Sequence, residues 1–153
     1  MNILVTGGAG FIGSNFIHYM LKKYETYKII NYNALTYSGN LNNVKSIQDN
    51  PNYSFVKGEI QNGEMLEHVI HECDAQVIVN FAAESHVDRS IENPIPFYDT
   101  NVIGTVTLLE LVKKYPHIKL VQVSTDEVYG SLVRTGKFTE NGEIYRGNPI
   151  SAK

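Results

Sequence analysis

Three glycines near the N-terminus have the spacing of a phosphate-binding turn. Gly7, Gly10 and Gly13 lie in the stretch NILVTGGAGFIGSNFIHYML, after an apolar run and at the start of a segment with helical periodicity. They allow a tight turn out of a strand, close approach of a pyrophosphate to the backbone, and close packing of the helix on the sheet. The helix N-terminus adds free N–H groups and partial positive charge, so an anion can bind there without Lys or Arg. The stretch predicts a dinucleotide site, and the alternative is a tight turn that binds nothing.

An asparagine stands where such a site usually has an acidic residue. About 20 positions after the glycines, a carboxylate at the end of the second strand normally accepts hydrogen bonds from the adenosine ribose. The residue here is Asn33, which can accept a hydrogen bond but has no charge to repel a 2′-phosphate. No Arg stands nearby in the sequence to bind such a phosphate. We therefore expect NAD rather than NADP as the cofactor.

The elements that would position these residues follow an alternating pattern. Short apolar runs alternate with segments of helical periodicity, as βαβ units require. The predicted strands are Asn2–Thr6, Lys28–Asn33, Tyr53–Lys57, Gln76–Phe81 and Ile118–Ser124. The predicted helices are Phe11–Tyr24, Leu41–Gln48, Gly63–Glu72 and Pro96–Tyr115. We therefore expect an α/β fold with a Rossmann-type, doubly wound parallel sheet, whose ligands bind at the carboxyl ends of the strands.

Composition and charge favour a globular domain that binds a small ligand. The 153 residues suit about one domain, and 42% are hydrophobic and 19% charged. A net charge of −3 gives no broad basic surface, so we expect neither nucleic acid nor a membrane as a partner. No apolar run reaches the roughly 18 residues of a membrane span, and we see no signal peptide, so we expect a cytoplasmic protein. The single cysteine, Cys73, is expected to be a buried or spectator thiol, and no metal site is predicted.

The tyrosines in KKYETYK and NYNALTY could suggest an aromatic surface for nucleic acid. Such stacking surfaces come with a basic groove, which the acidic net charge does not favour. We therefore expect these tyrosines to pack in the ordinary way or to flank an adenine pocket.

Five stretches together resemble one enzyme family. They are TGGAGFIG (6–13), ALTYSGNLNN (34–43), NFAAESHVDRS (80–90), TNVIGTVTLLE (100–110) and VSTDEVYG (123–130). They resemble the nucleotide-sugar branch of the extended short-chain dehydrogenases, and most closely the dTDP-glucose 4,6-dehydratases. The stretch STDEVYG is the most specific, because related epimerases and decarboxylases do not usually have Asp-Glu after that Ser-Thr. The resemblance runs from Met1 to about Lys153.

The resemblance implies a reaction and residues that carry it. In this family NAD takes a hydride from C4 of dTDP-glucose, water is eliminated across C5 and C6, and the hydride returns to C6, giving dTDP-4-keto-6-deoxyglucose. By similarity, Asp126 is the acid at the C6 hydroxyl, Glu127 is the base at C5, and Thr125 hydrogen-bonds the sugar near C4. Adjacent carboxyls can divide this work if their environments separate their pKa values.

The glycine turn and the resemblance together give a set of cofactor-binding residues. They are Gly7, Gly10, Phe11, Ile12, Gly13, Asn33, Glu59, Ile60, Ala82, Ala83, Ser85 and Thr100. By family likeness Ala82, Ala83 and Ser85 line the nicotinamide half, with Thr100 close by. Glu59 stands where the family has an Asp beside adenine. Asn101 is expected to bridge backbone groups, and His86 is not assigned to catalysis.

The last residues depart from the family. A short-chain dehydrogenase uses a Tyr to remove the hydroxyl proton and a Lys four residues later to lower the pKa of that Tyr. The family motif resembles SPYSASK, whereas NPISAK (148–153) places Ile150 at the Tyr position and Lys153 only three residues later. We interpret residues 1–130 as an NAD-binding, Rossmann-like domain. Residues 131–153 are interpreted as a loop-rich tail leading into a degenerate YxxxK region, truncated before the C-terminal substrate domain.

These observations predict the activity of the dTDP-glucose 4,6-dehydratase family, with this chain alone weak or inactive. One alternative is a non-catalytic NAD-binding or interaction module. Another is a related epimerase or dehydratase that acts on a different nucleotide sugar. Because the sheet would have an exposed edge and apolar helix faces, we also expect self-association or a homo-oligomer.

Overall fold

Five short apolar segments form one parallel sheet in the computed structural model, which describes residues 1–129 and 136–141. The strands are β1 (Asn2–Thr6), β2 (Lys28–Asn33), β3 (Tyr53–Lys57), β4 (Val77–Asn80) and β5 (Lys119–Gln122). The first three have the predicted bounds. The last two are one or two residues shorter at each end, although backbone hydrogen bonds such as Phe81 N–H to the Thr6 carbonyl continue past them. The predictions for residues 130–135 and 142–153, including Ile150 and Lys153, lie outside the described residues.

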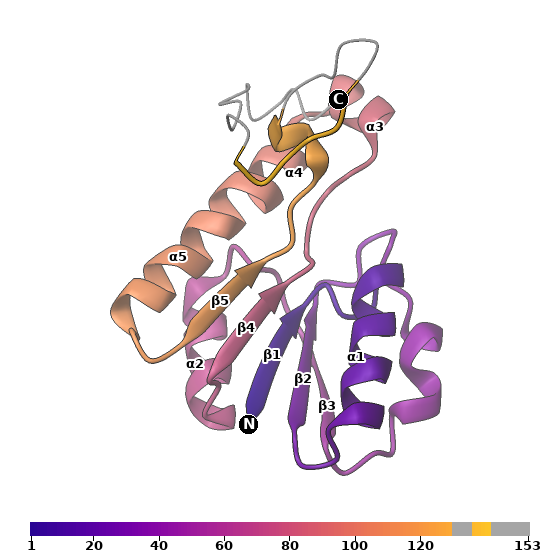
Figure 1. The fold of residues 1–153 in the computed structure, drawn as a ribbon, viewed down its shortest axis with the longest axis vertical. Helices are drawn as coiled ribbons and strands as arrows, with labels where there is room; N and C mark the ends of the chain where they lie inside the picture. The colour runs from indigo at the N-terminus through magenta and orange to yellow at the C-terminus, as the bar shows by residue number, and fades with distance from the viewer. Residues whose placement is uncertain (130–135, 142–153) are drawn as a thin grey trace.

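The order of the strands creates a place for a ligand. The sheet runs β3-β2-β1-β4-β5, and every neighbouring pair is parallel (Figure 1). The chain moves outward from β1 to β3, then returns to the opposite side of β1 and continues through β4 to β5. This reversal lies between β1 and β4, and doubly wound sheets bind ligands at the carboxyl ends of the strands at such a point. The prediction of an α/β, doubly wound parallel sheet is confirmed.

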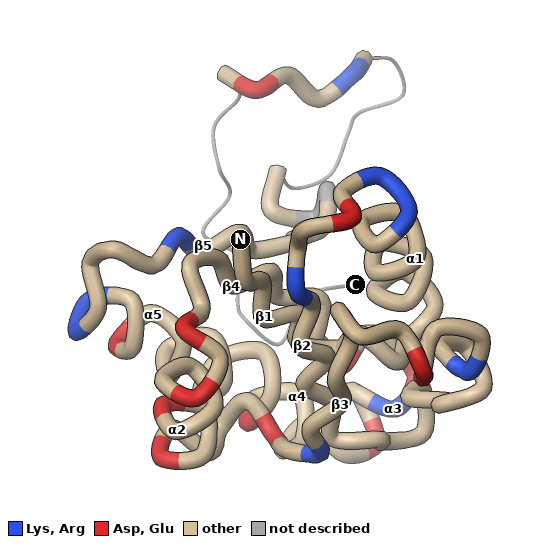
Figure 2. The backbone as a smooth tube through the Cα atoms, turned by 90° about the horizontal axis from the view of Figure 1, so that it is seen from below, with Lys and Arg blue, Asp and Glu red and all other residues tan. Residues whose placement is uncertain are grey.

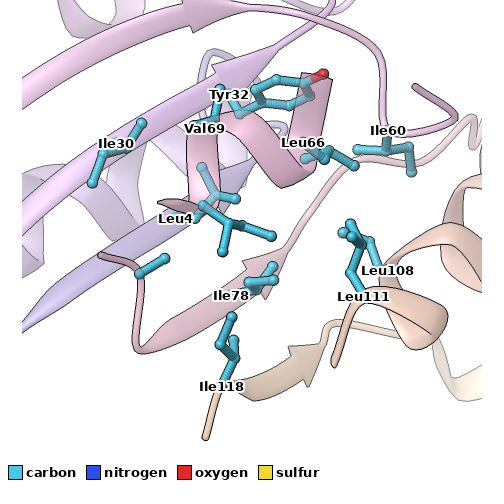
Figure 3. Close-up of a cluster of buried hydrophobic side chains, with 12 residues drawn as sticks. Leu4, Ile30, Tyr32, Ile60, Leu66, Val69, Ile78, Leu108, Leu111 and Ile118 are labelled. Carbon is cyan, nitrogen blue, oxygen red and sulfur yellow. The ribbon is translucent and has the colours of Figure 1, made fainter. Parts of the chain in front are cut away.

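Both faces of the sheet are covered by helices, because alternate residues of each strand point to opposite sides. Helix α1 (Phe11–Lys23) covers one face, where Ile17 and Leu21 pack with Ile3 and Val5 of β1. Helices α2 (Gly63–Cys73) and α5 (Thr105–Lys114) cover the other face. Figure 3 shows this second core, whose labelled residues are Leu4, Ile30, Tyr32, Ile60, Leu66, Val69, Ile78, Leu108, Leu111 and Ile118. The central strands β1 and β4 are mostly buried, which explains their continuous apolar runs in the sequence.

The helices after β2 and β4 differ from the predictions. The segment predicted as a helix over Leu41–Gln48 is a 3₁₀ helix, η1 (Leu41–Ile47). Asn40 caps its N-terminus, because the Asn40 Oδ1 accepts a hydrogen bond from Asn42 N–H at 3.0 Å. The single helix predicted over Pro96–Tyr115 is a run of three segments: α4 (Ile95–Phe97), the π-helical η2 (Tyr98–Gly104) and α5. At the junction, Gly104 lies so close to Ile60 that a Cβ there would overlap its side chain. This tight packing accompanies the change in helical winding.

Two short helical segments were not predicted from the periodicity. They are α3 (Val87–Glu92) and the 3₁₀ turn η3 (Asp126–Tyr129). The described side chains of α3 are exposed or only partly buried, so the sequence has no buried apolar stripe there that could have revealed it. Both segments follow the carboxyl ends of strands, on the side of the sheet where the ligand crevice lies.

Charged residues lie mostly outside the central strands of the fold. Viewed from the amino ends of the strands, Lys, Arg, Asp and Glu lie mostly on helices and loops, and the central strands β1 and β4 carry none (Figure 2). In the part of the chain that the structure describes, no helix is both long and apolar enough to cross a bilayer. Cys73 is half-buried against the second core, and burial raises the pKa of its thiol, as expected for a spectator cysteine.

The second core generates a prediction about stability. Leu108 is fully buried, whereas its neighbour Leu109 on the same helix is 49% exposed. Leu108→Ala should lower the free energy of unfolding by about 2–5 kcal/mol, because it removes buried methyl groups and leaves a cavity. Leu109→Ala is the matched control and should change it by less than about 0.5 kcal/mol. Urea denaturation followed by circular dichroism measures both, and equal effects would contradict the placement of α5 on the sheet.

Candidate functional site

A cleft of about 280 Å³ opens at the carboxyl ends of the strands. This volume is near the lower end of the roughly 300–1,000 Å³ of small-molecule sites. Its lining comes from the ends of β1, β2, β3 and β4, their following loops, and the α4–η2 segment. The lining residues are Gly7, Gly10, Tyr32, Asn33, Ala34, Thr36, Ser38, Gly58, Glu59, Ile60, Gln61, Phe81, Ala82, Ala83, Glu84, Pro96, Asp99 and Thr100.

The glycine turn forms the floor of the cleft where β1 ends. Gly7 has a φ of 71°, and its N–H donates to the Tyr32 carbonyl at 3.0 Å. A Cβ on Gly7 would lie 2.6 Å from the Ala82 nitrogen, and a Cβ on Gly13 would lie 2.5 Å from the Gly7 carbonyl oxygen. Any side chain at either position would therefore push the turn away from β4 or from α1. The packing that we inferred from the glycine spacing is present in the structure.

The start of α1 leaves its amide donors available. Gly10 caps the helix without a side-chain hydrogen bond, and the first turn contains no acidic residue. Phe11 and Ile12 are 82% and 63% exposed, so their side chains lie in solvent and outside the cleft lining. Any contact they make with an anion at the turn would come from their backbone N–H groups. Gly13 also lies outside the lining and serves the packing of the turn.

Asn33 ends β2 as predicted, and its side chain is hydrogen-bonded to the backbone of the following turn. It is 8% exposed, and its Oδ1 accepts a hydrogen bond from Leu35 N–H at 2.7 Å. Leu35 has a φ of 57°, an uncommon value for a residue with a Cβ, and this hydrogen bond holds the turn in place. Asn33 lines the cleft, and its Nδ2 group is a donor rather than the acceptor that an adenosine ribose usually meets.

The end of β3 is tied to β2 below the cleft. Burial raises the pKa of Tyr32 to about 12, so its hydroxyl stays protonated near neutral pH. This hydroxyl donates to the Glu59 carbonyl oxygen at 3.0 Å. The Glu59 side chain is exposed at the cleft, while Ile60 is buried in the second core. Tyr32 thus packs in the ordinary way and flanks the cleft, as we expected of the tyrosines in this stretch.

The segment after β4 forms the opposite wall. Asn80 is fully buried, and its Oδ1 accepts from Ala82 N–H at 3.1 Å. Further along, Asn101 in η2 accepts from Glu84 N–H at 2.9 Å and donates to the Glu84 carbonyl at 2.8 Å. The prediction that Asn101 bridges backbone groups is confirmed. Ser85 is exposed and lies outside the cleft lining, as does His86.

The cleft brings together most of the predicted cofactor-binding residues and adds others. Gly7, Gly10, Asn33, Glu59, Ile60, Ala82, Ala83 and Thr100 all line it. Residues that sequence reasoning missed include Thr36 and Ser38 in the loop after β2 and Asp99 in η2. Thr36 and Ser38 fall inside the quoted stretch ALTYSGNLNN, so the resemblance was the only signal that pointed to them.

The predicted catalytic residues lie beyond β5. Thr125 is exposed and outside the cleft lining, and its carbonyl accepts from Val128 N–H at 3.4 Å. The backbone of Asp126 and Glu127 begins η3, and their side chains are outside the described part of the structure. Their roles as acid and base therefore stay a prediction.

The charges around the cleft have one sign. Among the lining residues, the acidic side chains are those of Glu59, Glu84 and Asp99. The described lining contains no Lys or Arg, so an anionic ligand would have to rely on the amides at the start of α1. This is the arrangement that the glycine turn predicted.

Comparisons with known proteins identify the family. Residues 4–152 match the family model described as GDP-mannose 4,6 dehydratase. The low-salt glycan biosynthesis protein Agl12 of Haloferax volcanii is 49% identical over 99% of this chain and 48% of its own length. The dTDP-glucose 4,6-dehydratase of Xanthomonas campestris is 46% identical over 97% of this chain and 44% of its own length.

A solved structure agrees with these sequences. The crystal structure of dTDP-glucose 4,6-dehydratase from Bacillus anthracis, in complex with NAD, is 78% identical and superposes with a TM-score of 0.88. The match covers 98% of this chain and 46% of that one. The chain thus spans about half the length of the relatives it matches. The strand order, the glycine turn and the match over residues 4–152 together show that this chain belongs to the GDP-mannose 4,6 dehydratase family of Rossmann-like proteins.

Proposed function

We propose that this chain binds NAD in the cleft and supplies the cofactor-binding part of a dTDP-glucose 4,6-dehydratase. The observation that supports this most strongly is the convergence of Gly7, Asn33, Glu59, Ala82 and Thr100, which are far apart in the sequence, on one cleft. Related proteins that carry the dehydratase name match nearly the whole chain, and one of them was crystallised with NAD.

The residues of the cleft suit a dinucleotide. The bare backbone at Gly7 and the uncapped start of α1 offer N–H groups to a pyrophosphate. Glu59 and Ile60 would border adenine, and Asn33 would meet the adenosine ribose. Ala82, Ala83, Ser85 and Thr100 would border the nicotinamide. Once bound, NAD supplies a hydride acceptor that can later return the hydride.

The proton transfers would fall to residues after β5. We propose Asp126 as the acid that protonates the leaving C6 hydroxyl and Glu127 as the base that removes the C5 proton. Thr125 would hydrogen-bond the sugar near C4 and polarise the developing carbonyl. Ile150 stands at the position of the family Tyr, and its side chain cannot carry a proton. We therefore propose that this chain alone turns over weakly or not at all.

The other functions we considered are distinguished by specific residues. A non-catalytic NAD-binding module is favoured by Ile150 and would show cofactor binding without turnover. A related nucleotide-sugar epimerase is less well supported, because the Asp126-Glu127 pair in STDEVYG is unusual among epimerases.

Cofactor binding is tested by titrating the purified chain with NAD in a calorimeter, with NADP as a comparison. We expect saturable NAD binding and weaker NADP binding, because the carboxylates of the cleft disfavour an additional phosphate. No heat of NAD binding at millimolar cofactor would contradict the proposal.

Asn33→Asp should raise the affinity for NAD by about tenfold, since hydrogen bonds to a charged acceptor are stronger than those to a neutral one. One oxygen of the new carboxylate can keep the Leu35 N–H bond while the other faces the ribose. The same change should weaken NADP further. Asn42→Asp adds the same charge at an exposed site in η1, outside the cleft lining, and should change neither affinity.

Turnover is tested by incubating the chain with NAD and dTDP-glucose and following the 4-keto-6-deoxy product. Loss of a positioned proton carrier should place kcat at least about a hundredfold below the roughly 10 s⁻¹ of an ordinary enzyme. Glu127→Gln should abolish any residual activity while leaving NAD affinity unchanged. An ordinary rate from the unmodified chain would refute the proposed inactivity.

We also propose that the chain self-associates through the edge of β5. This strand is the last of the described sheet, and Val121 and Val123 are 49% and 40% exposed. Val121→Lys should shift the chain toward monomer in light scattering, because an edge lysine opposes strand pairing. Ser54→Lys introduces the same charge at an exposed position of the other edge strand, β3, and should have no such effect. A monodisperse monomer at high concentration would contradict self-association.

A further inference from the structure

A loop and a short helix on opposite sides of the cleft are joined by a contact that the proposed function does not use. Tyr37 lies in the loop between β2 and η1, whereas Arg89 lies in α3, after β4. The guanidinium carbon of Arg89 is 4.0 Å from the centroid of the Tyr37 ring. This distance is well within the roughly 6 Å of a cation–π interaction. Burial and the nearby Glu84 carboxylate both raise the pKa of the Tyr37 hydroxyl. One tyrosine therefore lies close to two charged groups, Arg89 and Glu84, of the opposite wall.

The partners of Tyr37 are held on a firm support. The Asn101 side chain makes two hydrogen bonds to the Glu84 backbone, at 2.9 and 2.8 Å. Because Asn101 belongs to η2, which continues into α5, this wall is anchored to a helix packed on the sheet. The contact with Tyr37 is thus made to a positioned group rather than to a free loop.

The loop that carries Tyr37 is anchored at both ends. Near its start, the Asn33 side chain accepts from Leu35 N–H at 2.7 Å. At its end, Asn40 N–H donates to the Ala9 carbonyl at 3.0 Å, which ties the loop to the glycine turn. Between these anchors, Gly39 N–H donates to the Thr36 carbonyl at 3.0 Å. The loop holds Tyr37 out toward the opposite wall.

The contact lies at the rim of the cleft. Thr36 and Ser38, on either side of Tyr37 in the sequence, line the cleft from one wall, and Glu84 lines it from the other. Tyr37 itself is 51% exposed and does not line the cleft. A ligand bound against Thr36, Ser38 and Glu84 would therefore have to pass the contact between Tyr37 and Arg89 when it dissociates.

We propose that Tyr37, Glu84 and Arg89 form a clasp across the rim of the cleft that slows the release of a bound dinucleotide. Tyr37 and Arg89 act here as positioning residues that hold the two walls together, and this inference rests on the proposed binding of NAD. The clasp differs in role from the glycine turn: the turn would bind the anion, whereas the clasp joins the two walls of the cleft. Its main effect falls on the dissociation rate, because most affinity differences among variants of one site lie in that rate.

The dissociation rate can be measured directly by stopped flow. The purified chain is loaded with NADH, excess NAD is mixed in, and the loss of bound NADH fluorescence is followed. Tyr37→Ala removes both the ring and the hydroxyl and should raise the dissociation rate by about tenfold. Tyr37→Phe keeps the ring over Arg89 but removes the hydroxyl beside Glu84, so its rate should lie between those of Tyr37→Ala and the unmodified chain.

Tyr19→Ala is the matched control. Tyr19 is 55% exposed and has a lysine ammonium, that of Lys23, 5.1 Å from its ring centroid, but it lies on α1 outside the cleft. Its removal should leave the dissociation rate unchanged. The thermal midpoints of the apo forms separate a clasp from a merely structural contact, because a structural role would lower the midpoint without changing the NADH dissociation rate.

Each result decides between the proposals. NADH binding with an unchanged dissociation rate in Tyr37→Ala overturns the clasp and leaves the proposed cofactor site standing. Absence of NADH binding by the unmodified chain overturns the cofactor site and the clasp with it. If Tyr37→Ala fails to fold, Tyr37→Phe carries the test, and an unchanged dissociation rate in that variant overturns the clasp.

Discussion

The close approach of the Gly7 backbone to the end of β4 is the contact on which the cleft depends. Only a residue without a Cβ fits there, because a Cβ on Gly7 would lie 2.6 Å from the Ala82 nitrogen. Asn80 holds this approach from below, because its Oδ1 accepts from both the Thr6 hydroxyl and Ala82 N–H. Its Nδ2 donates to Gln122 in β5 at 2.8 Å, so one buried amide links three strands at their carboxyl ends. A buried amide with these partners fixes the positions of the three strand ends relative to one another, and therefore the shape of the floor of the cleft.

The same packing determines how the cleft can hold an anion. Its charged lining residues are Glu59, Glu84 and Asp99, which repel phosphate, and the described lining has no cation to offset them. Favourable interactions must come from backbone N–H groups at the start of α1, at a distance set by the glycine turn. A site of this kind can hold a pyrophosphate at one place and disfavours phosphate elsewhere. The acidic residues of the cleft therefore favour NAD over NADP, which carries an additional phosphate, even though Asn33 itself has no charge.

The regular part of the fold could be predicted, and the irregular part could not. The strands Asn2–Thr6, Lys28–Asn33 and Tyr53–Lys57 have the predicted bounds. The first two are buried along most of their length, which gives them the largely apolar sequences of strands covered on both faces. The π-helical turn of η2 and the helix α3 were missed because tertiary contacts, such as Gly104 against Ile60, determine them rather than periodicity.

Within the candidate site, the same division holds. The glycine turn and the bridging role of Asn101 followed from residue type and position. Asp99 and the contact between Tyr37 and Arg89 did not, because both depend on tertiary partners that are distant in the sequence. Periodicity has no information about such partners.

The two halves of the proposed function are physically separable in this fold. All the lining residues of the cleft lie between residues 7 and 100. The helices behind them pack on both faces of the sheet. The five described strands already enclose the crevice between β1 and β4. The proposed catalytic residues begin at Thr125, past the end of β5 and outside that enclosure. In the proposed function, the cofactor contacts come mainly from residues 7–100, whereas the proposed acid and base follow β5. A change at the proposed acid and base need not disturb the packing of the cleft.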